Sequence, residues 1–85
     1  MRILYLPKFA KQYKKLPQKI QETATKKETI FRENPFDQRL RTHKLSGVLA
    51  EYWAFSVNAS HRIIFDFTKN DTVRFYQIGH HDIYD

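Results

Sequence analysis

The first third of the chain changes from a strand-like to a helix-like pattern of apolar residues. Residues 2–6 form a short β-like run that ends at Pro7, and proline suits the first turn of a helix. From Phe9 onwards the next apolar residues recur at i, i+4 and i+7 with lysines around them, which is typical of an amphipathic helix. The pattern predicts a strand and then a first helix, which Pro17 ends.

A second amphipathic helix is predicted over residues 18–33. Its apolar side carries Ile20, Ala24 and Phe31, with Ile30 beside the last. The dipeptide at 34–35, Asn-Pro, should stop this helix because proline disfavours helical backbone in the residue before it. The two helices would therefore form a hairpin.

The second half of the chain shows no further helical period. Residues 36–50 have no clear periodicity and are expected to form a long loop, which is often functional in a compact domain. Three strand-like runs then follow, separated by short turns. We expect an α+β fold in which an N-terminal strand, a two-helix hairpin and a three-stranded antiparallel meander form one sheet packed on the helices. A single domain would span residues 1–85.

The first turn of the meander sets which side chains face the helices. A two-residue loop at Ala59-Ser60 pairs Phe55 with Ile64 on one face and Ala54 with Phe65 on the other. Small residues opposite large ones fill space well, so the face with Ala54 and Phe65 is the predicted core.

The second turn is predicted by the same reasoning. A three-residue loop at 69–71 pairs Phe65 with Phe75 in the core and places Asp66 opposite Arg74 outside it. A two-residue loop would turn Arg74 inward, which costs several kcal/mol for an unpaired buried charge. The longer loop is therefore expected.

The sheet face away from the helices is then predicted to be apolar with one cation. It would carry Trp53, Phe55, Val57, Arg62, Ile64, Tyr76, Ile78 and His80. Such a face could stack bases and hold a phosphate, dock another protein, or form a second small core beneath the loop. These three interpretations remain open at the level of sequence.

Charge is unevenly distributed along the chain. Residues 1–44 hold 12 Lys/Arg against four Asp/Glu, whereas residues 45–85 hold three against five, within a net charge of +6. A basic half suggests a polyanion or an acidic protein as partner, and the alternative is that the lysines only keep the helices soluble. With no cysteine and no apolar run of membrane-spanning or signal-peptide length, the expected location is the cytoplasm and no membrane partner is expected.

Titratable groups gather at the end of the chain. Three of the four histidines, His61, His80 and His81, lie there together with Arg62. Such groups can bind phosphate and transfer protons near neutral pH without a metal or cofactor. A metal site made from His80, His81 and Asp82 is disfavoured, because adjacent side chains on a strand point to opposite faces.

The order of short motifs resembles a known family. These motifs are His43-Lys44-Leu45-Ser46-Gly47, Tyr52-Trp53, His61-Arg62-Ile63-Ile64-Phe65 and the terminal run Ile78 to Tyr84. Their order and spacing are similar to the RelE/ParE superfamily of bacterial toxins, and most similar to its RelE, YoeB and YafQ ribonuclease branches. The resemblance implies a toxin of a type II toxin–antitoxin system that cuts mRNA in the ribosomal decoding site. It also implies an acidic antitoxin as partner, in an assembly such as a heterotetramer.

The resemblance implies roles for individual residues. Arg62 would hold the scissile phosphate, His80 or His81 would transfer a proton, and Tyr84 would stack on or orient the substrate. His43 matches the loop histidine of YafQ-like members. The remaining implied RNA contacts are Lys44, Arg41, Trp53, Phe55 and His61, and neither a metal nor a cofactor is implied.

Two other functional classes compete with the ribonuclease. The ParE branch shares the fold but inhibits DNA gyrase through protein contacts, and a basic RNA- or ribosome-binding module would need no chemistry. Trp53 and Phe55 replace strand lysines of the RelE branch, and the segment 37–44 lacks the glutamate of the YoeB branch. A histidine-based site in the style of YafQ fits the sequence best.

Overall fold

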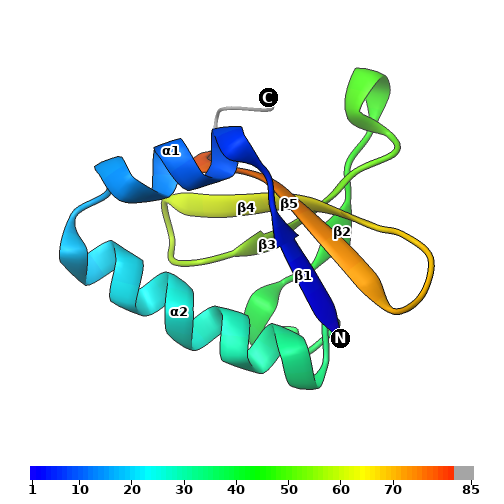
Figure 1. Ribbon diagram of the computed structural model, residues 1–85, viewed down its shortest axis with the longest axis horizontal. Coiled ribbons are helices and arrows are strands. Elements are labelled where there is room, and N and C mark those ends of the chain that lie inside the picture. The colour runs from blue at the N-terminus through cyan, green and yellow to red at the C-terminus, as the bar shows by residue number, and fades with distance from the viewer. Residues whose placement is uncertain (82–85) are drawn as a thin grey trace.

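Two helices lie against one face of a five-stranded sheet (Figure 1) in the computed structural model, which describes residues 1–81. The elements in chain order are β1 (Arg2–Tyr5), α1 (Pro7–Lys15), α2 (Gln18–Glu33), β2 (His43–Lys44), β3 (Trp53–Ser56), β4 (His61–Phe67) and β5 (Thr72–His80). The strand order is β1-β5-β4-β3-β2, and only the β1–β5 pair is parallel. The expected α+β class, with strand, helical hairpin and meander, is confirmed. The edge strand β2 was not predicted.

The boundaries of the helical hairpin follow the local sequence. Pro7 occupies the first turn of α1, and the helix ends at Lys15, just before the extended residue Leu16 and Pro17. The second helix spans residues 18–33, as predicted, and the backbone N–H of Asn34 still donates to Ile30 O at 2.9 Å. These boundaries were predictable because prolines restrict backbone conformation in their immediate neighbourhood.

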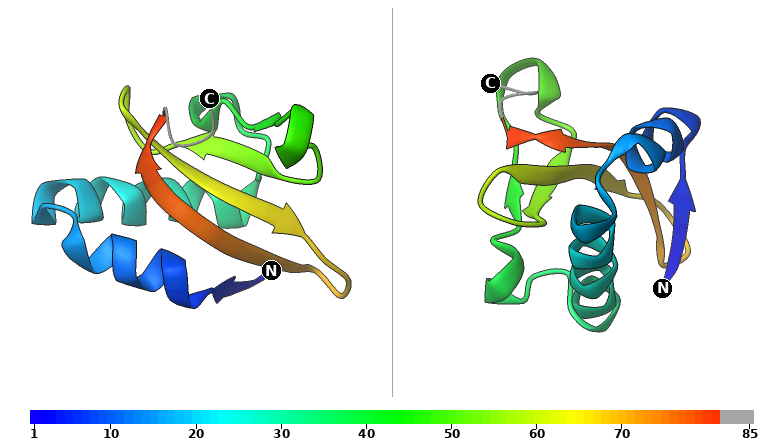
Figure 2. Two further views of the ribbon diagram at one scale, coloured as in Figure 1. Left: turned by 90° about the horizontal axis from the view of Figure 1, so that it is seen from above. Right: turned by 90° about the vertical axis from the view of Figure 1, so that its left-hand side faces the viewer.

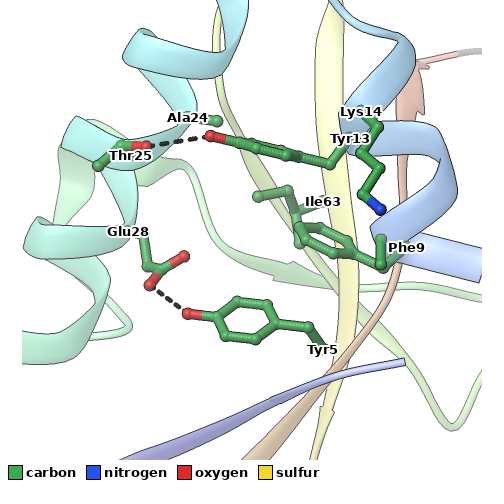
Figure 3. Close-up of a pocket in the computed structure, with 9 residues that line it drawn as sticks. Tyr5, Phe9, Tyr13, Lys14, Ala24, Thr25, Glu28 and Ile63 are labelled. Carbon is green, nitrogen blue, oxygen red and sulfur yellow. Dashed lines mark hydrogen bonds between the residues drawn. The ribbon is translucent and has the colours of Figure 1, made fainter. Parts of the chain in front are cut away.

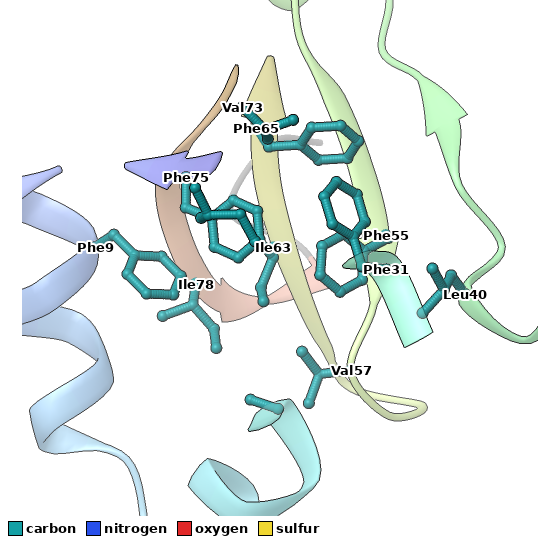
Figure 4. Close-up of a cluster of buried hydrophobic side chains, with 12 residues drawn as sticks. Phe9, Phe31, Leu40, Phe55, Val57, Ile63, Phe65, Val73, Phe75 and Ile78 are labelled. Atoms are coloured by element: carbon teal, nitrogen blue, oxygen red, sulfur yellow. The ribbon is translucent and has the colours of Figure 1, made fainter. Parts of the chain in front are cut away.

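An aromatic cluster forms the main core between α2 and the sheet (Figure 4). The fully buried ring of Phe31 lies 4.8 Å from Phe55, 4.9 Å from Phe65 and 5.6 Å from Phe75, measured between ring centroids. One residue of α2 therefore contacts one aromatic ring from each of β3, β4 and β5. Truncating a buried Phe to Ala typically costs about 3–5 kcal/mol, so this ring is central to the attachment of α2.

The predicted register between β3 and β4 is wrong by one residue. Phe55 pairs with Ile63, and Ser56 pairs with Arg62. The turn is longer than expected because Asn58 Oδ1 accepts the backbone N–H groups of Ser60 at 2.8 Å and His61 at 2.7 Å. A shift of one residue exchanges the two faces of a strand, so Phe55 lies in the core with 0% exposure.

The register of the next hairpin begins as predicted and then changes. Asp66 pairs with Arg74, and Phe65 pairs with Phe75. Beyond this point a β-bulge shifts the register of β5, so that Ile64 pairs with Gln77. The bulge reverses the alternation of the remaining residues of β5 relative to the prediction.

The bulge places Ile78 in the main core and sets His80 opposite His61. The predicted outer face is wrong for three residues that are buried in the main core: Phe55 and Val57, because of the register shift of β3, and Ile78, because of the bulge. It is wrong for Trp53 and His80 as well, because the first packs against that core and the second follows Ile78 in the alternation.

The sheet face turned away from the helices, called the distal face below, carries a second apolar cluster. Buried Leu45, Ala54 and Ile64 pack there with Leu49 and Tyr52. Figure 2 shows the segment between β2 and β3 on the side of the sheet opposite the helices. The third sequence interpretation, a small core beneath the loop, thus holds for this part of the face.

Neither of the two α-helices within residues 1–81 is long and apolar enough to cross a membrane.

Candidate nucleic-acid site

Arg62 lies on the distal face of β4, between Ser56 of β3 and Gly79 of β5. Its half-buried side chain donates from Nη1 to Asn58 O at 2.8 Å and to His61 O at 3.1 Å. Among residues 1–81 no carboxylate forms an ion pair with it. Gly79 brings no side chain to the position opposite Arg62 on β5.

Arg74 lies on the same face at the other end of the β4–β5 hairpin. Its Nε and Nη2 atoms donate to the two carboxylate oxygens of Asp66 at 3.0 and 2.6 Å. The Tyr76 hydroxyl also donates to Asp66, at 3.1 Å, and the Arg74 guanidinium carbon lies 5.4 Å from the Tyr76 ring centroid. Tyr52 packs edge-on against Tyr76 with a ring separation of 4.9 Å. This arginine is therefore neutralised by a carboxylate of the neighbouring strand.

The protonation of the Arg74 network follows from these contacts. The hydrogen bond to Asp66 raises the pKa of Arg74 above the ordinary arginine value. Burial raises the pKa of Tyr76, and its hydrogen bond to Asp66 acts in the same direction. Both groups are held in the protonated form that donates to the carboxylate.

Three histidines lie together at the end of β5. His61 and His80 are opposite each other across β4 and β5 with ring centroids 5.0 Å apart, and the His81 ring lies 6.1 Å from that of His80. Burial, and to a lesser degree the nearby His80, lowers the pKa of His61. The His81 N–H donates to Ser60 O at 2.8 Å, which continues the ladder one residue beyond His80.

The register of β5 places the first of the two candidate proton carriers, because the strand ends at His80. Sequence alternation alone favoured His80 for the face of Arg62, but the bulge leaves His80 aligned with Ile78 on the helix side. His81 follows the end of β5 in 3₁₀ backbone, so strand alternation does not assign its side chain to either face. This change could not be predicted, because nothing in the local sequence marks a bulge at Tyr76.

The predicted loop residues lie at the far edge of the sheet. His43 pairs with Ala54 and therefore shares the distal face, whereas Lys44 pairs with Trp53 and belongs to the other face. His43 Nδ1 lies 3.0 Å from Arg41 O, and all three loop residues, His43, Lys44 and Arg41, are exposed. His43 and Arg62 are two strands apart, which corresponds to about 10 Å across the sheet.

The aromatic residues expected to bind RNA do not lie beside Arg62. Phe55 stacks on Phe31 inside the core and cannot reach a base. Trp53 is half-buried on the helix side, where it contacts Phe36 and Phe67 with ring separations of 5.4 and 5.7 Å. Both expectations depended on the wrong register. Tyr84 lies outside the described residues.

Within residues 1–81, no group of three or more His, Asp or Glu side chains is arranged to hold a metal ion.

A cavity of about 430 Å³ lies between α1, α2 and the sheet (Figure 3). Its walls are mostly apolar and are formed by Tyr5, Phe9, Ala10, Tyr13, Lys14, Ala24, Thr25, Glu28 and Ile63. Two tyrosine hydroxyls close its sides, Tyr5 donating to Glu28 Oε2 at 2.5 Å and Tyr13 lying 3.3 Å from Thr25 Oγ1. Sequence patterns did not reveal this cavity, because it depends on how the two helices are set apart.

Comparisons with known proteins depend on structure, because no protein-family model and no curated protein matches the sequence. A YoeB/ParE toxin from Agrobacterium tumefaciens superposes with a TM-score of 0.81 at 18% identity, over 95% of this chain and 99% of that one. YafQ from Escherichia coli strain BL21(DE3) gives 0.76 at 24% identity, over 95% and 94% of the two chains. The chain has the RelE/ParE toxin fold. The fold expected from the sequence motifs is thereby confirmed.

A third RelE/ParE-fold structure comes from an assembly. It is the heterotetrameric YoeB–YefM toxin–antitoxin complex from Staphylococcus aureus, with a TM-score of 0.77, 16% identity and coverage of 95% of this chain and 97% of that one. In all three comparisons the RelE/ParE fold spans nearly the whole of both chains, so no large element is added or lost.

Proposed function

We propose that the protein is the toxin of a type II toxin–antitoxin system and an endoribonuclease that cleaves mRNA on the ribosome, in the cytoplasm. The observation that carries the proposal is Arg62. It is half-buried, held by two main-chain carbonyls, and without an ion pair to any carboxylate among residues 1–81. A cation held in this way favours an anionic ligand over solvent. The RelE/ParE fold and the sequence motifs support RNA as that ligand.

The proposed reaction requires only protein groups. A base removes the proton of a ribose 2′-hydroxyl, the oxygen attacks the adjacent phosphorus, and the bond to the 5′ oxygen breaks as an acid protonates that oxygen. Arg62 would hold the phosphate and stabilise the charge that develops on its oxygens. A guanidinium suits this role because it can bind two phosphate oxygens at once.

Histidines are the proposed acid and base. The register of β5 sets His80 on the face opposite Arg62, which leaves His81 as the proposed proton carrier, and His43 shares the face of Arg62 from the edge strand. Tyr84, by its resemblance to the terminal aromatic of the family, would stack on the substrate. Lys44 and Arg41 would contact more distant phosphates from the exposed edge, and His61 would have a supporting role.

The helical side of the molecule supports an acidic antitoxin as partner. α1 carries Lys8, Lys11, Lys14 and Lys15 and no acidic residue. The cavity beneath it is mostly apolar, with Lys14 in its wall and the carboxylate of Glu28 held by the Tyr5 hydroxyl. An acidic amphipathic segment could place an apolar side chain in the cavity and its carboxylates against the lysines. Such a segment would fold on binding, and two copies of each chain would give a heterotetramer.

The experiment compares the wild type with Arg62→Ala, His80→Ala and His81→Ala, expressed in cells while mRNA 5′ ends are mapped during growth arrest. Arg62→Ala should lower the cleavage rate by about 10²–10³-fold, the usual effect of removing one transition-state donor. His81→Ala should reduce cleavage more than His80→Ala. Lys69→Ala is the matched control, because it removes one positive charge from the exposed β4–β5 turn.

Two results would replace the proposal. Growth arrest with no new mRNA ends, unchanged by Arg62→Ala, would leave a binding module or a different target. DNA breaks linked to gyrase would support the ParE-like alternative.

A further inference from the structure

His61 and His80 form a cross-strand pair at the open end of the β4–β5 hairpin. They occupy directly opposed positions in the antiparallel register, and their ring centroids are 5.0 Å apart with an interplanar angle of 51°. Neither ring is fully buried. Two imidazoles that share a tetrahedral metal ion at about 2.1 Å per nitrogen have ring centres roughly 5 Å apart. The backbone register therefore sets the two rings at a separation suited to one ion.

The hydrogen bonds of Asn58 determine which nitrogen of His61 carries the proton. Asn58 Oδ1 accepts the main-chain N–H groups of Ser60 and His61 at 2.8 and 2.7 Å, so this atom is the amide oxygen. The same oxygen lies 3.1 Å from His61 Nδ1. Since an oxygen acceptor needs a donor opposite it, Nδ1 carries the hydrogen and Nε2 carries the lone pair. Metal-binding histidines are commonly oriented in this way, by donating their other N–H to an oxygen.

We propose that His61 and His80 together bind one Zn²⁺ or Cu²⁺ ion, with water completing the coordination. Imidazole ligands favour these ions over Mg²⁺ or Ca²⁺, which prefer oxygen. Asn58 is the positioning residue, because it fixes the tautomer and orientation of His61. The bound ion would join the first residue of β4 to the last residue of β5. This inference goes beyond the proposed function and does not depend on RNA cleavage.

The test uses the full chain without a polyhistidine tag and titrates ZnCl₂ and CuCl₂ separately in a calorimeter. One ion per chain is expected, and Cu²⁺ should bind more tightly than Zn²⁺. His61→Gln and His80→Gln should each weaken binding by at least about 10-fold, and Asn58→Ala by a similar factor through loss of orientation. His43→Gln is the matched control, because it removes an exposed histidine from the opposite edge of the sheet.

A second set of measurements distinguishes loss of a metal ligand from loss of folding. Circular dichroism of each ion-free variant should match the wild type. Zn²⁺ at about 100 times its Kd should raise the Tm of the wild type by roughly 10–20 °C, and it should leave the Tm of His61→Gln nearly unchanged. The proposal is overturned if no saturable binding occurs below about 1 mM Zn²⁺. Equal weakening by His43→Gln, or unchanged binding in a folded His61→Gln protein, would overturn it as well.

Discussion

Arg62 and Arg74 lie on the same face of the same hairpin, yet their environments are opposite. Arg74 is held by both oxygens of Asp66 and lies beside the Tyr76 ring, so its charge is already neutralised within the sheet. Arg62 is held by two main-chain carbonyls, and within the described residues 1–81 it has no ion pair with a carboxylate. A cation that is positioned but not neutralised is suited to an external anion, whereas a neutralised one mainly stabilises the sheet.

The largest expected effect comes from giving Arg62 a carboxylate neighbour, as Arg74 already has in Asp66. Ser56 pairs directly with Arg62 and is buried, so Ser56→Asp would place an acid beside the guanidinium. RNA cleavage should fall by about 10²-fold or more, comparable to loss of a transition-state donor, although Arg62 is still present. In vitro cleavage of a model mRNA on ribosomes would measure this.

Ser56→Asn is the matched control for that substitution, because it has nearly the same size and no charge. It should retain most of the activity that Ser56→Asp loses. If the two variants lose activity equally, crowding at Ser56 and not charge neutralisation explains the effect. Thermal unfolding of both variants would show that each is folded.

Removing the carboxylate partner of Arg74 tests whether that arginine mainly stabilises the sheet. Asp66→Ala removes the two hydrogen bonds of Arg74 and the acceptor of Tyr76, so the Tm should fall while cleavage by the folded protein changes less than about threefold. Arg74→Ala should lower the Tm less, because Asp66 keeps the Tyr76 hydroxyl. A double-mutant cycle in thermal unfolding measures the coupling, and additive effects would show that the pair is not coupled.

The smallest expected effect is the pH dependence of the Tyr76 network. Since the folded pKa of Tyr76 is raised above its usual value near 10.0, the unfolded chain loses this proton first. Its contribution to stability is therefore fully present below about pH 10 and is lost as the pH rises through the folded pKa. The absorbance of the tyrosine phenolate should show that Tyr76 loses its proton at a higher pH than an ordinary tyrosine. Stability in the Tyr76→Phe variant should fall less between pH 9 and about pH 11, and equal slopes would contradict the assignment.

The helical hairpin and the turn at 69–71 could be predicted because their signals are local. Pro7, Pro17 and Asn34 mark the helix boundaries by direct steric and hydrogen-bonding effects, and the Asp66–Arg74 pairing follows from the cost of burying a charge. The single-residue register shift at β3 was not predictable from alternation, which fits either register of a strand with apolar residues on both sides.

In the candidate site, too, the residues that depend on local signals were placed correctly and those that depend on strand register were not. Arg62 was identified from sequence, and its position on the distal face is as predicted, because β4 is regular on both sides of it. The assignment of Phe55 failed when the turn lengthened by one residue. The choice between His80 and His81 was left open by the sequence, and the expected place of His80 on the face of Arg62 was wrong because one bulge changes the orientation of every later residue in the strand.

The sequence by itself determined the helix boundaries, the fold class, the order of every element except the edge strand β2, and the identity of the residues available for chemistry, because the signals for these are mostly local. The tertiary structure decided which of those residues share a face. That outcome depends on two small irregularities, the turn that Asn58 closes and the bulge at Tyr76. Side chains on a strand alternate with a period of two, so one added residue is enough to move a side chain from a site into the core.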